Sequence, residues 1–149
     1  MCAPIGKHTW SPREAADAGL EAFNARDLEA LAALYRPDAV IVTPDAGELK
    51  GREQVAEYHR GFIQAFPDGT TEVVAKHDAG NITIDEWIFR GTNSGPLPAP
   101  SGEIIPPTGR RVSVRGVDVQ THGAGGVSAH HIYFDQIEFL TQLGLMPGF

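Results

Sequence analysis

An imidazole, a phenol and a carboxylate alternate along residues 128–135, whose sequence is SAHHIYFD. In a regular strand, successive side chains point to opposite faces, so His131, Tyr133 and Asp135 would share one face and His130 would lie on the other. A β-bulge within the segment would exchange the two faces. These groups can move protons. A carboxyl group in an apolar pocket can take a proton from carbon and return one to oxygen, while an imidazole holds a proton or binds a substrate oxygen.

Asp135 also has a purely structural interpretation. The sequence Asp135-Gln136-Ile137-Glu138 has the pattern of a capping box, in which the aspartate begins a helix. An ionised cap keeps a low pKa, so one carboxylate cannot fully serve as both a helix cap and an acid/base catalyst. On the residues alone, the helix cap is the favoured interpretation.

Glu86 is the second candidate acid. A strand would place it on one face with Ile84 and Ile88, and would place Trp87 and Phe89 on the other. Glu86 would then either contact a substrate inside a cavity or lie exposed on an outer face, and the exposed position is slightly favoured. If Glu86 and Asp135 both pointed inward, their repulsion would raise the pKa of one carboxyl group.

Aromatic side chains suitable for a planar ligand come from two segments. Tyr58 and Phe62 recur at helical spacing, and Trp87 and Phe89 recur at strand spacing, although ordinary core packing explains such patterns more often. Asn93 could donate a hydrogen bond to a substrate carbonyl or act only as a turn residue. The predicted substrate contacts are Tyr58, Phe62, Glu86, Trp87, Asn93 and Tyr133.

Other common chemistries lack their sequence patterns. The six histidines show neither HxH nor HExxH spacing, and the one cysteine, Cys2, lies at the start of the sequence. No GxSxG, P-loop or GxGxxG pattern occurs, and no helix follows the glycine-rich turn 123–126 to cradle a phosphate. The sequence therefore predicts neither a metal nor an organic cofactor.

Length and charge narrow the classes further. The 149 residues carry a net charge of −7 and are 42% hydrophobic, which predicts one folded domain over 1–149, with residues 1–10 as a flexible N-terminal segment. An acidic chain with scattered basic residues argues against nucleic acid or a membrane surface as a partner. No signal sequence and no membrane-spanning stretch is evident, so we expect a cytoplasmic protein.

The pattern of elements predicts an α+β fold. Helices are expected over 12–23, 28–35 and 52–66, starting with the capping sequence Ser11-Pro12-Arg13-Glu14. Strands follow at 39–43, 70–76, 81–91, 110–120 and 127–134, with a kink at Gly116, a proline-rich loop at 94–107 and a short final helix at 136–143. Helices packed on one face of a curved antiparallel sheet would leave a conical cavity between them.

Four segments together carry a resemblance to a known family: AFPD at 65–68, EWIFRGTNSGPL at 86–97, PPTGRRVSVRGVDV at 106–119 and YFDQIEFLTQLGL at 133–145. In their order and spacing they resemble the SnoaL-like polyketide cyclases of the nuclear transport factor 2-like fold, over roughly residues 11–147. The resemblance implies a cone of curved antiparallel sheet closed by three helices, which binds hydrophobic small molecules. It also implies ring closure by intramolecular aldol condensation without metal or cofactor.

The resemblance also suggests site residues. The family's acid/base aspartate, just before the last helix, matches Asp135 and reverses the preference for a simple cap, with His131 as its catalytic support. The chain departs from the family where Asn93 replaces a histidine in Gly91-Thr92-Asn93, and where Glu86 stands in place of an arginine beside the tryptophan. Both changes fall near the expected pocket.

The predicted function is therefore cofactor-independent acid/base chemistry on a hydrophobic, carbonyl-bearing molecule, with polyketide-type cyclisation as the family default. Two alternatives stay open: a non-catalytic small-molecule-binding module, and an isomerase, dehydratase or epoxide hydrolase on the same scaffold. Because a small curved sheet leaves an apolar outer face, a homodimer or homotetramer is also expected.

Overall fold

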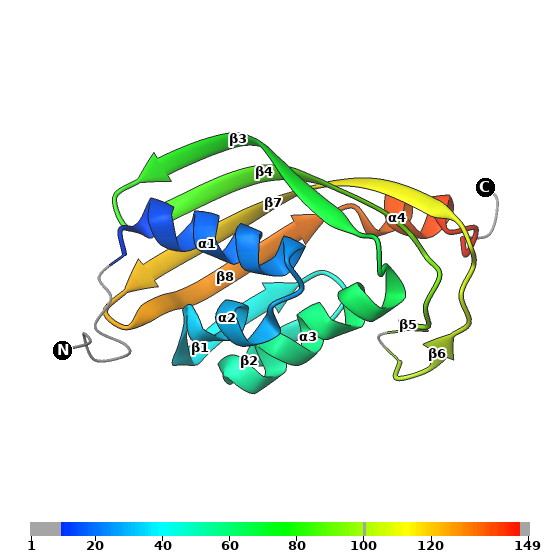
Figure 1. Cartoon of the computed structure of the whole chain (residues 1–149), viewed down its shortest axis with the longest axis horizontal. Helices are drawn as coiled ribbons and strands as arrows, with labels where there is room; N and C mark the ends of the chain where they lie inside the picture. Colours follow the sequence, from blue (N-terminus) through cyan, green and yellow to red (C-terminus); the bar gives the residue numbers. More distant parts are fainter. Residues whose placement is uncertain (1–9, 100, 147–149) are drawn as a thin grey trace.

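The computed structural model describes residues 10–99 and 101–146. Cys2 and, apart from Trp10, the segment predicted to be flexible lie outside the described residues. The elements in chain order are α1 (Pro12–Asn24), α2 (Leu28–Ala33), β1 (Tyr35–Thr43), β2 (Gly47–Lys50), α3 (Gly51–Ala65), β3 (Thr70–Ala79), β4 (Ile82–Thr92), β5 (Leu97–Pro98), β6 (Ile104–Ile105), β7 (Arg111–Gly123), β8 (Gly126–Phe134) and α4 (Gln136–Gln142) (Figure 1).

The first two helices begin at the predicted caps. The Ser11 hydroxyl accepts a hydrogen bond from the Glu14 amide at 3.1 Å, and the Glu14 carboxylate accepts one from the Ser11 amide at 2.9 Å. Asp27 caps α2 through the amide of Ala30. Helix α2 is shorter than predicted, because Tyr35 is not its last residue but the first of β1.

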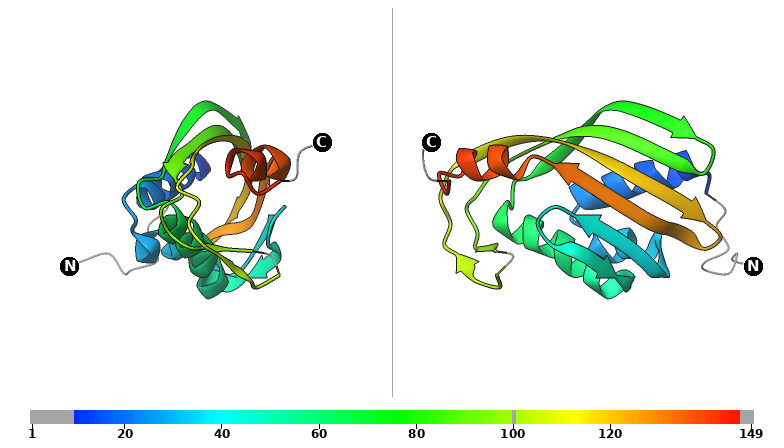
Figure 2. Two further views of the ribbon diagram at one scale, coloured as in Figure 1. Left: turned by 90° about the vertical axis from the view of Figure 1, so that its right-hand side faces the viewer. Right: turned by 180° about the vertical axis from the view of Figure 1, so that it is seen from behind.

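Six strands form one sheet in the order β2-β1-β8-β7-β4-β3. Neighbours pair antiparallel except for β1 and β8, which are parallel, so the predicted antiparallel meander is confirmed only for β3, β4, β7 and β8. Seen end-on, the sheet curls around one side of the molecule, and the three N-terminal helices close the other side (Figure 2). The predicted α+β architecture is confirmed, with β2 and the small β5–β6 ribbon as additions.

Two clusters of buried apolar side chains join the layers. One contains Ile41, Val55 and Val127, among others, and the second contains Phe66, Phe89 and Phe139. Phe23, Trp87 and Phe134 are partly buried and pack against both clusters. Burial of each large apolar side chain contributes about 1.5–3 kcal/mol, so these clusters hold the helices against the sheet.

Strand β8 contains a bulge that sets the direction of its side chains. Thr121 of β7 pairs with Ala129, but the next residue, His122, pairs with Val127, so Ser128 is an extra residue in the ladder. The Ser128 hydroxyl donates a hydrogen bond to the Thr121 carbonyl at 3.1 Å. Beyond the bulge the buried positions are the even-numbered ones, including His130.

Asn93 fastens the proline-rich loop to α3. It is fully buried, and its amide nitrogen donates hydrogen bonds to the carbonyls of Ala65 (3.1 Å) and Gly95 (3.0 Å). Its amide oxygen accepts hydrogen bonds from the backbone and hydroxyl of Thr108 at 2.8 and 2.9 Å. Every hydrogen-bonding position of the amide is thereby used.

The outer surface bears several large apolar side chains. Val74, Ile104, Tyr133 and Ile137 are each more than half exposed. The predicted association into a dimer or tetramer stays a prediction. No helix within the described parts of the chain is long and apolar enough to cross a membrane.

Replacing Asn93 by alanine should lower the free energy of unfolding by about 2–4 kcal/mol, because four hydrogen bonds are lost and buried partners stay unpaired. Asn81→Ala is the matched control, since its side chain makes one part-buried hydrogen bond, to the His122 carbonyl, and should cost about 1 kcal/mol. Chemical denaturation measures both. Equal losses in the two variants would contradict this role for Asn93.

Candidate active site in the cavity between sheet and helices

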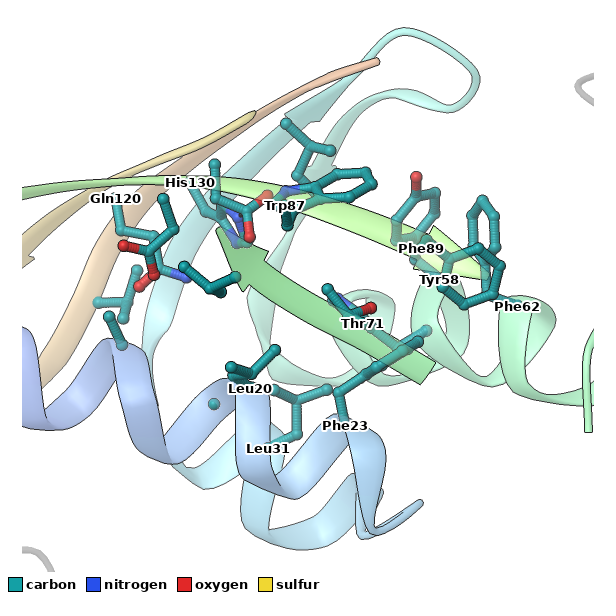
Figure 3. A pocket seen from close by; sticks show the side chains of 18 of the residues that line it. Leu20, Phe23, Leu31, Tyr58, Phe62, Thr71, Trp87, Phe89, Gln120 and His130 are labelled. Carbon is teal, nitrogen blue, oxygen red and sulfur yellow. Dashed lines mark ion pairs between the residues drawn. The ribbon is translucent and has the colours of Figure 1, made fainter. Parts of the chain in front are cut away.

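A cavity of about 120 Å³ lies between the concave face of the sheet and helices α1, α2 and α3 (Figure 3). One water molecule requires roughly 10–15 Å³ by the same measure, so the cavity has room for an organic molecule. Most of its wall is apolar. The aromatic side chains that line it are Phe23, Tyr58, Phe62, Trp87, Phe89, Phe134 and Phe139. The polar side chains are Tyr35, His59, Thr71, Asp85, Asp118, Gln120 and His130.

The register of three strands brings four of the polar side chains together. Asp118 on β7 lies opposite Asp85 on β4, and Gln120 lies opposite His130 on β8. Directly paired residues of antiparallel strands project on the same face, and here that face is concave. Figure 3 shows Gln120 and His130 at one end of the cavity, with Tyr58, Phe62 and Phe89 at the other.

His130 stands between a phenol and a carboxylate. Its Nδ1 lies 2.8 Å from the Tyr35 hydroxyl, and its Nε2 lies 3.2 Å from Asp118 Oδ1. The second contact is short enough for an ion pair but does not have hydrogen-bond geometry, since Nε2 has no hydrogen-bond partner among residues 10–99 and 101–146. Burial raises the pKa of Tyr35, so its hydroxyl stays protonated and can donate to Nδ1. That bond would place the imidazole proton on Nε2, facing Asp118.

Asp85 is tied to a cation, whereas Asp118 is not. Arg13 of α1 donates to Asp85 Oδ1 at 2.7 Å and also to Asp78 at the same distance. Burial opposes ionisation of Arg13, but these hydrogen bonds outweigh it and raise its pKa. Burial raises the pKa of Asp85, although the Arg13 hydrogen bond acts against that rise. Within the described residues Asp118 has no arginine or lysine partner, so its carboxylate is the one available for proton transfer.

Three buried polar atoms in the cavity wall lack hydrogen-bond partners in the described parts of the chain: Trp87 Nε1, Gln120 Oε1 and His130 Nε2. An unpaired buried polar group costs about 1–3 kcal/mol. Gly116 lies opposite Trp87, where a Cβ atom would collide with the indole ring, so the glycine makes room for it. The cavity wall therefore gives up stability to hold these unpaired polar atoms.

His59 of α3 adds an imidazole to the wall. Its Nδ1 lies 2.8 Å from the carbonyl oxygen of Val55, one helical turn earlier. Burial lowers the pKa of His59 to about 4, despite the opposing effect of that hydrogen bond. The ring is therefore neutral at pH 7.

This depressed pKa predicts a pH-dependent stability. Between about pH 6.5 and 4, the unfolded chain binds a proton at His59 that the folded chain does not, so the free energy of unfolding should fall as the pH falls through this range. Because the side chain is only partly buried, we expect about 1–2 kcal/mol rather than the full effect. Denaturation of wild type and His59→Phe at pH 7 and pH 4.5 measures the difference.

The comparison of the two proteins isolates His59, because burial also lowers the pKa of His122 and both proteins contain His122. Parallel loss of stability in the two proteins would show that His59 does not titrate in this way.

The structure places the predicted site residues in three different locations. Tyr58, Phe62 and Trp87 line the cavity, and their role as substrate contacts stays a prediction. Glu86 does not, since it lies half-exposed on the outer face of the sheet and pairs with His77 at 2.7 Å. Asn93 is committed to the loop and has no bond left for a substrate. Glu86 and Asn93 thus match their structural interpretations, an exposed residue of the outer face and a residue of the loop.

The group formed by His131, Tyr133 and Asp135 does not point into the cavity. All three are exposed, and His131 Nδ1 lies 3.3 Å from the Tyr133 hydroxyl on the outer face. Asp135 caps α4 by accepting a hydrogen bond from the Glu138 amide at 3.1 Å. The physical reason is the bulge at Ser128, which exchanges the two faces of β8 and sends His130 inward instead.

Several cavity residues were not predicted. Asp118 and Gln120 could have been found from β7, because they continue the alternation of the apolar residues Val112 and Val114. His59 occupies the position one helical turn after Val55. Among the described residues, no group of three or more histidine, cysteine, aspartate or glutamate side chains is arranged to hold a metal ion.

Comparison with known proteins identifies the family. Residues 16–131 match the SnoaL-like domain. The chain belongs to the SnoaL-like family. No curated protein matches it. Among solved structures it is similar to IdmH, a proposed polyketide cyclase from Streptomyces antibioticus, with 30% identity over 91% of this chain and 99% of that one, and a TM-score of 0.74.

Two solved structures with lower sequence identity share the architecture. A proposed SnoaL-like polyketide cyclase from Jannaschia sp. CCS1 has a TM-score of 0.80 at 18% identity, over 99% of both chains. TerC, which was co-crystallised with polyporic acid, has a TM-score of 0.72 at 15% identity, over 91% of this chain and 99% of that one. At these identities the likeness concerns the fold.

Proposed function

We propose that this SnoaL-like protein is a cofactor-independent acid/base enzyme acting on an apolar, carbonyl-bearing small molecule held in the cavity. The reaction that we favour is ring closure by intramolecular aldol condensation. The observation that carries the proposal is the carboxylate of Asp118, which lies beside His130 and has no arginine or lysine partner in the described residues, at the polar end of an aromatic cavity. The similarity to IdmH supports the same class of reaction.

In this mechanism Asp118 performs both proton transfers. Its carboxylate takes a proton from the carbon next to one substrate carbonyl, and the electron pair of that C–H bond forms the enolate. The enolate carbon attacks a second carbonyl of the same molecule, which forms a C–C bond and leaves an alkoxide. Protonated Asp118 then returns its proton to the alkoxide, so that the enzyme recovers its starting state and the substrate has been isomerised to a cyclic hydroxyketone.

His130 and Tyr35 are positioning residues in this scheme. The Tyr35 hydroxyl holds His130 Nδ1, which directs the opposite ring nitrogen towards Asp118. The aromatic wall would fold a flexible chain so that its two carbonyl-bearing segments meet. Asp85 stays with Arg13 and keeps that cation away from Asp118.

A second candidate is a binding module that takes up the same molecules without reaction. The three unpaired polar atoms in the cavity wall favour a ligand site, and they do not by themselves require catalysis. An isomerase would share the first proton transfer but would not form the C–C bond. These functions can be separated with one probe.

The test uses a phenyl-substituted δ-diketone in D₂O, followed by proton NMR. Deuterium exchange next to the carbonyls reports proton removal, and the cyclic product reports ring closure. Asp118→Asn should lower both rates at least 100-fold, because general acid/base groups contribute about 10²–10⁴-fold. Asp135→Asn is the matched control and should stay within about twofold of wild type, because asparagine is an equally good helix cap.

Each outcome has a distinct meaning. Exchange without closure in the wild type would indicate an isomerase, and binding without exchange would indicate a binding module. Full activity in folded Asp118→Asn would remove Asp118 from the mechanism. A large loss in Asp135→Asn together with that result would return the role to Asp135.

A further inference from the structure

We propose that His59 is a specificity-determining residue, a fixed hydrogen-bond acceptor that selects ligands carrying a neutral hydroxyl group on a flat ring. The inference deepens the proposed function in that it concerns the same cavity, but it does not depend on turnover. It rests on the tautomer of one imidazole, on the rings that hold it, and on the lack of a hydrogen bond between its second nitrogen and any described residue.

The backbone of α3 determines which nitrogen of His59 carries the proton. The Val55 carbonyl oxygen can only accept a hydrogen bond, so Nδ1, at 2.8 Å, must be the donor. The neutral ring then bears its lone pair on Nε2. Burial keeps the ring neutral near pH 7, with a pKa of about 4, so Nε2 can accept a hydrogen bond but cannot donate one.

Neighbouring rings restrict the imidazole to this orientation. Phe23 of α1 and Tyr58 of α3 both meet it edge to face, with centroid separations of 5.8 and 5.4 Å and interplanar angles of 69° and 85°. A ring flip would break the Val55 hydrogen bond and place a lone pair against a carbonyl oxygen. The acceptor is therefore pre-organised and does not adapt to its partner.

No described side chain satisfies this acceptor. His59 lines the cavity, and the only hydrogen bond of its ring is the one through Nδ1. Of the two residues next to His59 in sequence, Tyr58 donates its hydroxyl hydrogen to Asp45 Oδ1 at 2.9 Å, and Arg60 donates to Glu57. The groups whose charges act on His59 are His130 and Asp118, and an aspartate carboxylate offers no proton when it is ionised. A donor on the ligand can therefore bond to Nε2 in place of water.

The surroundings define the kind of donor. Edge-to-face neighbours suit a flat ring, and Phe62 and Phe89 meet at 6.0 Å and 81° further along the same wall. Asp85 and Asp118 line the cavity and would repel a carboxylate ligand. A phenol satisfies each requirement, because it is flat, is neutral below about pH 9 and donates an O–H bond. Its methyl ether has nearly the same shape but no proton to donate.

The experiment compares β-naphthol, its methyl ether and naphthalene by isothermal titration calorimetry at pH 7. Wild type should bind β-naphthol about tenfold more tightly than the ether, since the ether leaves the acceptor unpaired. In His59→Phe, which keeps a ring but removes the acceptor, the two affinities should differ by less than about twofold, and naphthalene should bind as well as before or better. His131→Phe, an exposed histidine on the outer face of β8, is the control and should keep the tenfold preference.

A second measurement reads the imidazole directly. Nitrogen-15 NMR of wild type should show His59 as the Nδ1–H tautomer at pH 7, and β-naphthol should shift its Nε2 resonance, whereas the ether should not. A protonated ring, the opposite tautomer, an undiminished preference for β-naphthol in His59→Phe, or failure of all three probes to bind would each overturn the proposal. Asp118→Asn should keep the preference. Wild-type protein that shows this selectivity but no proton exchange would count only against the proposed function.

Discussion

One extra residue in β8 determines the chemistry of the whole cavity. If Ser128 were paired as a regular residue of the ladder, the alternation that buries Val127 would also bury His131 and Tyr133. The bulge instead sends His130 inward, opposite Gln120 and beside Asp118, and leaves Asp135 at the surface to begin α4. A bulge costs a regular pair of ladder hydrogen bonds, and the Ser128 hydroxyl compensates in part by donating to Thr121. The inward position of His130 and the outward position of Asp135 are thus consequences of the same local irregularity.

Of the two neighbouring carboxylates in the cavity, Asp85 is paired with an arginine and Asp118 is not, among the described residues. Asp85 and Asp118 are cross-strand partners, and two such groups without a cation would repel each other in an apolar cavity. Arg13 resolves the conflict by reaching from α1 to Asp85, while its other nitrogens bond to Asp78. Helix α1 therefore closes the cavity and also supplies the cation that pairs with one of its two carboxylates. Removing Arg13 would leave the charge of Asp85 unpaired and so increase the repulsion on Asp118, although the structure gives no contact between Arg13 and Asp118.

The sequence predicted the elements better than it predicted the site. Helix caps such as Ser11 and Asp27 act over three residues, so local patterns identified them correctly. The alternation of β4 correctly separated Glu86 from Trp87, although it left open which face was inside. The face of β8 could not be predicted, because the bulge depends on pairing with β7 across the turn at 123–126. The family resemblance pointed to the carboxylate before the last helix, and that position proved to be a cap.

The cavity shows where this fold gives up stability for function. Asn93 has every hydrogen-bonding position used, which is the normal condition of a buried amide, and it fastens a loop. Trp87, Gln120 and His130 break that rule within a single cavity wall. Random packing defects would be scattered, whereas these three side chains all line the cavity that also contains Asp118, a carboxylate without an arginine or lysine partner in the described residues. A site that keeps polar atoms unpaired is ready for a change in the charge or proton position of its ligand, because its dipoles are in place before the ligand reacts. This readiness is what the proposed acid/base function requires of the cavity.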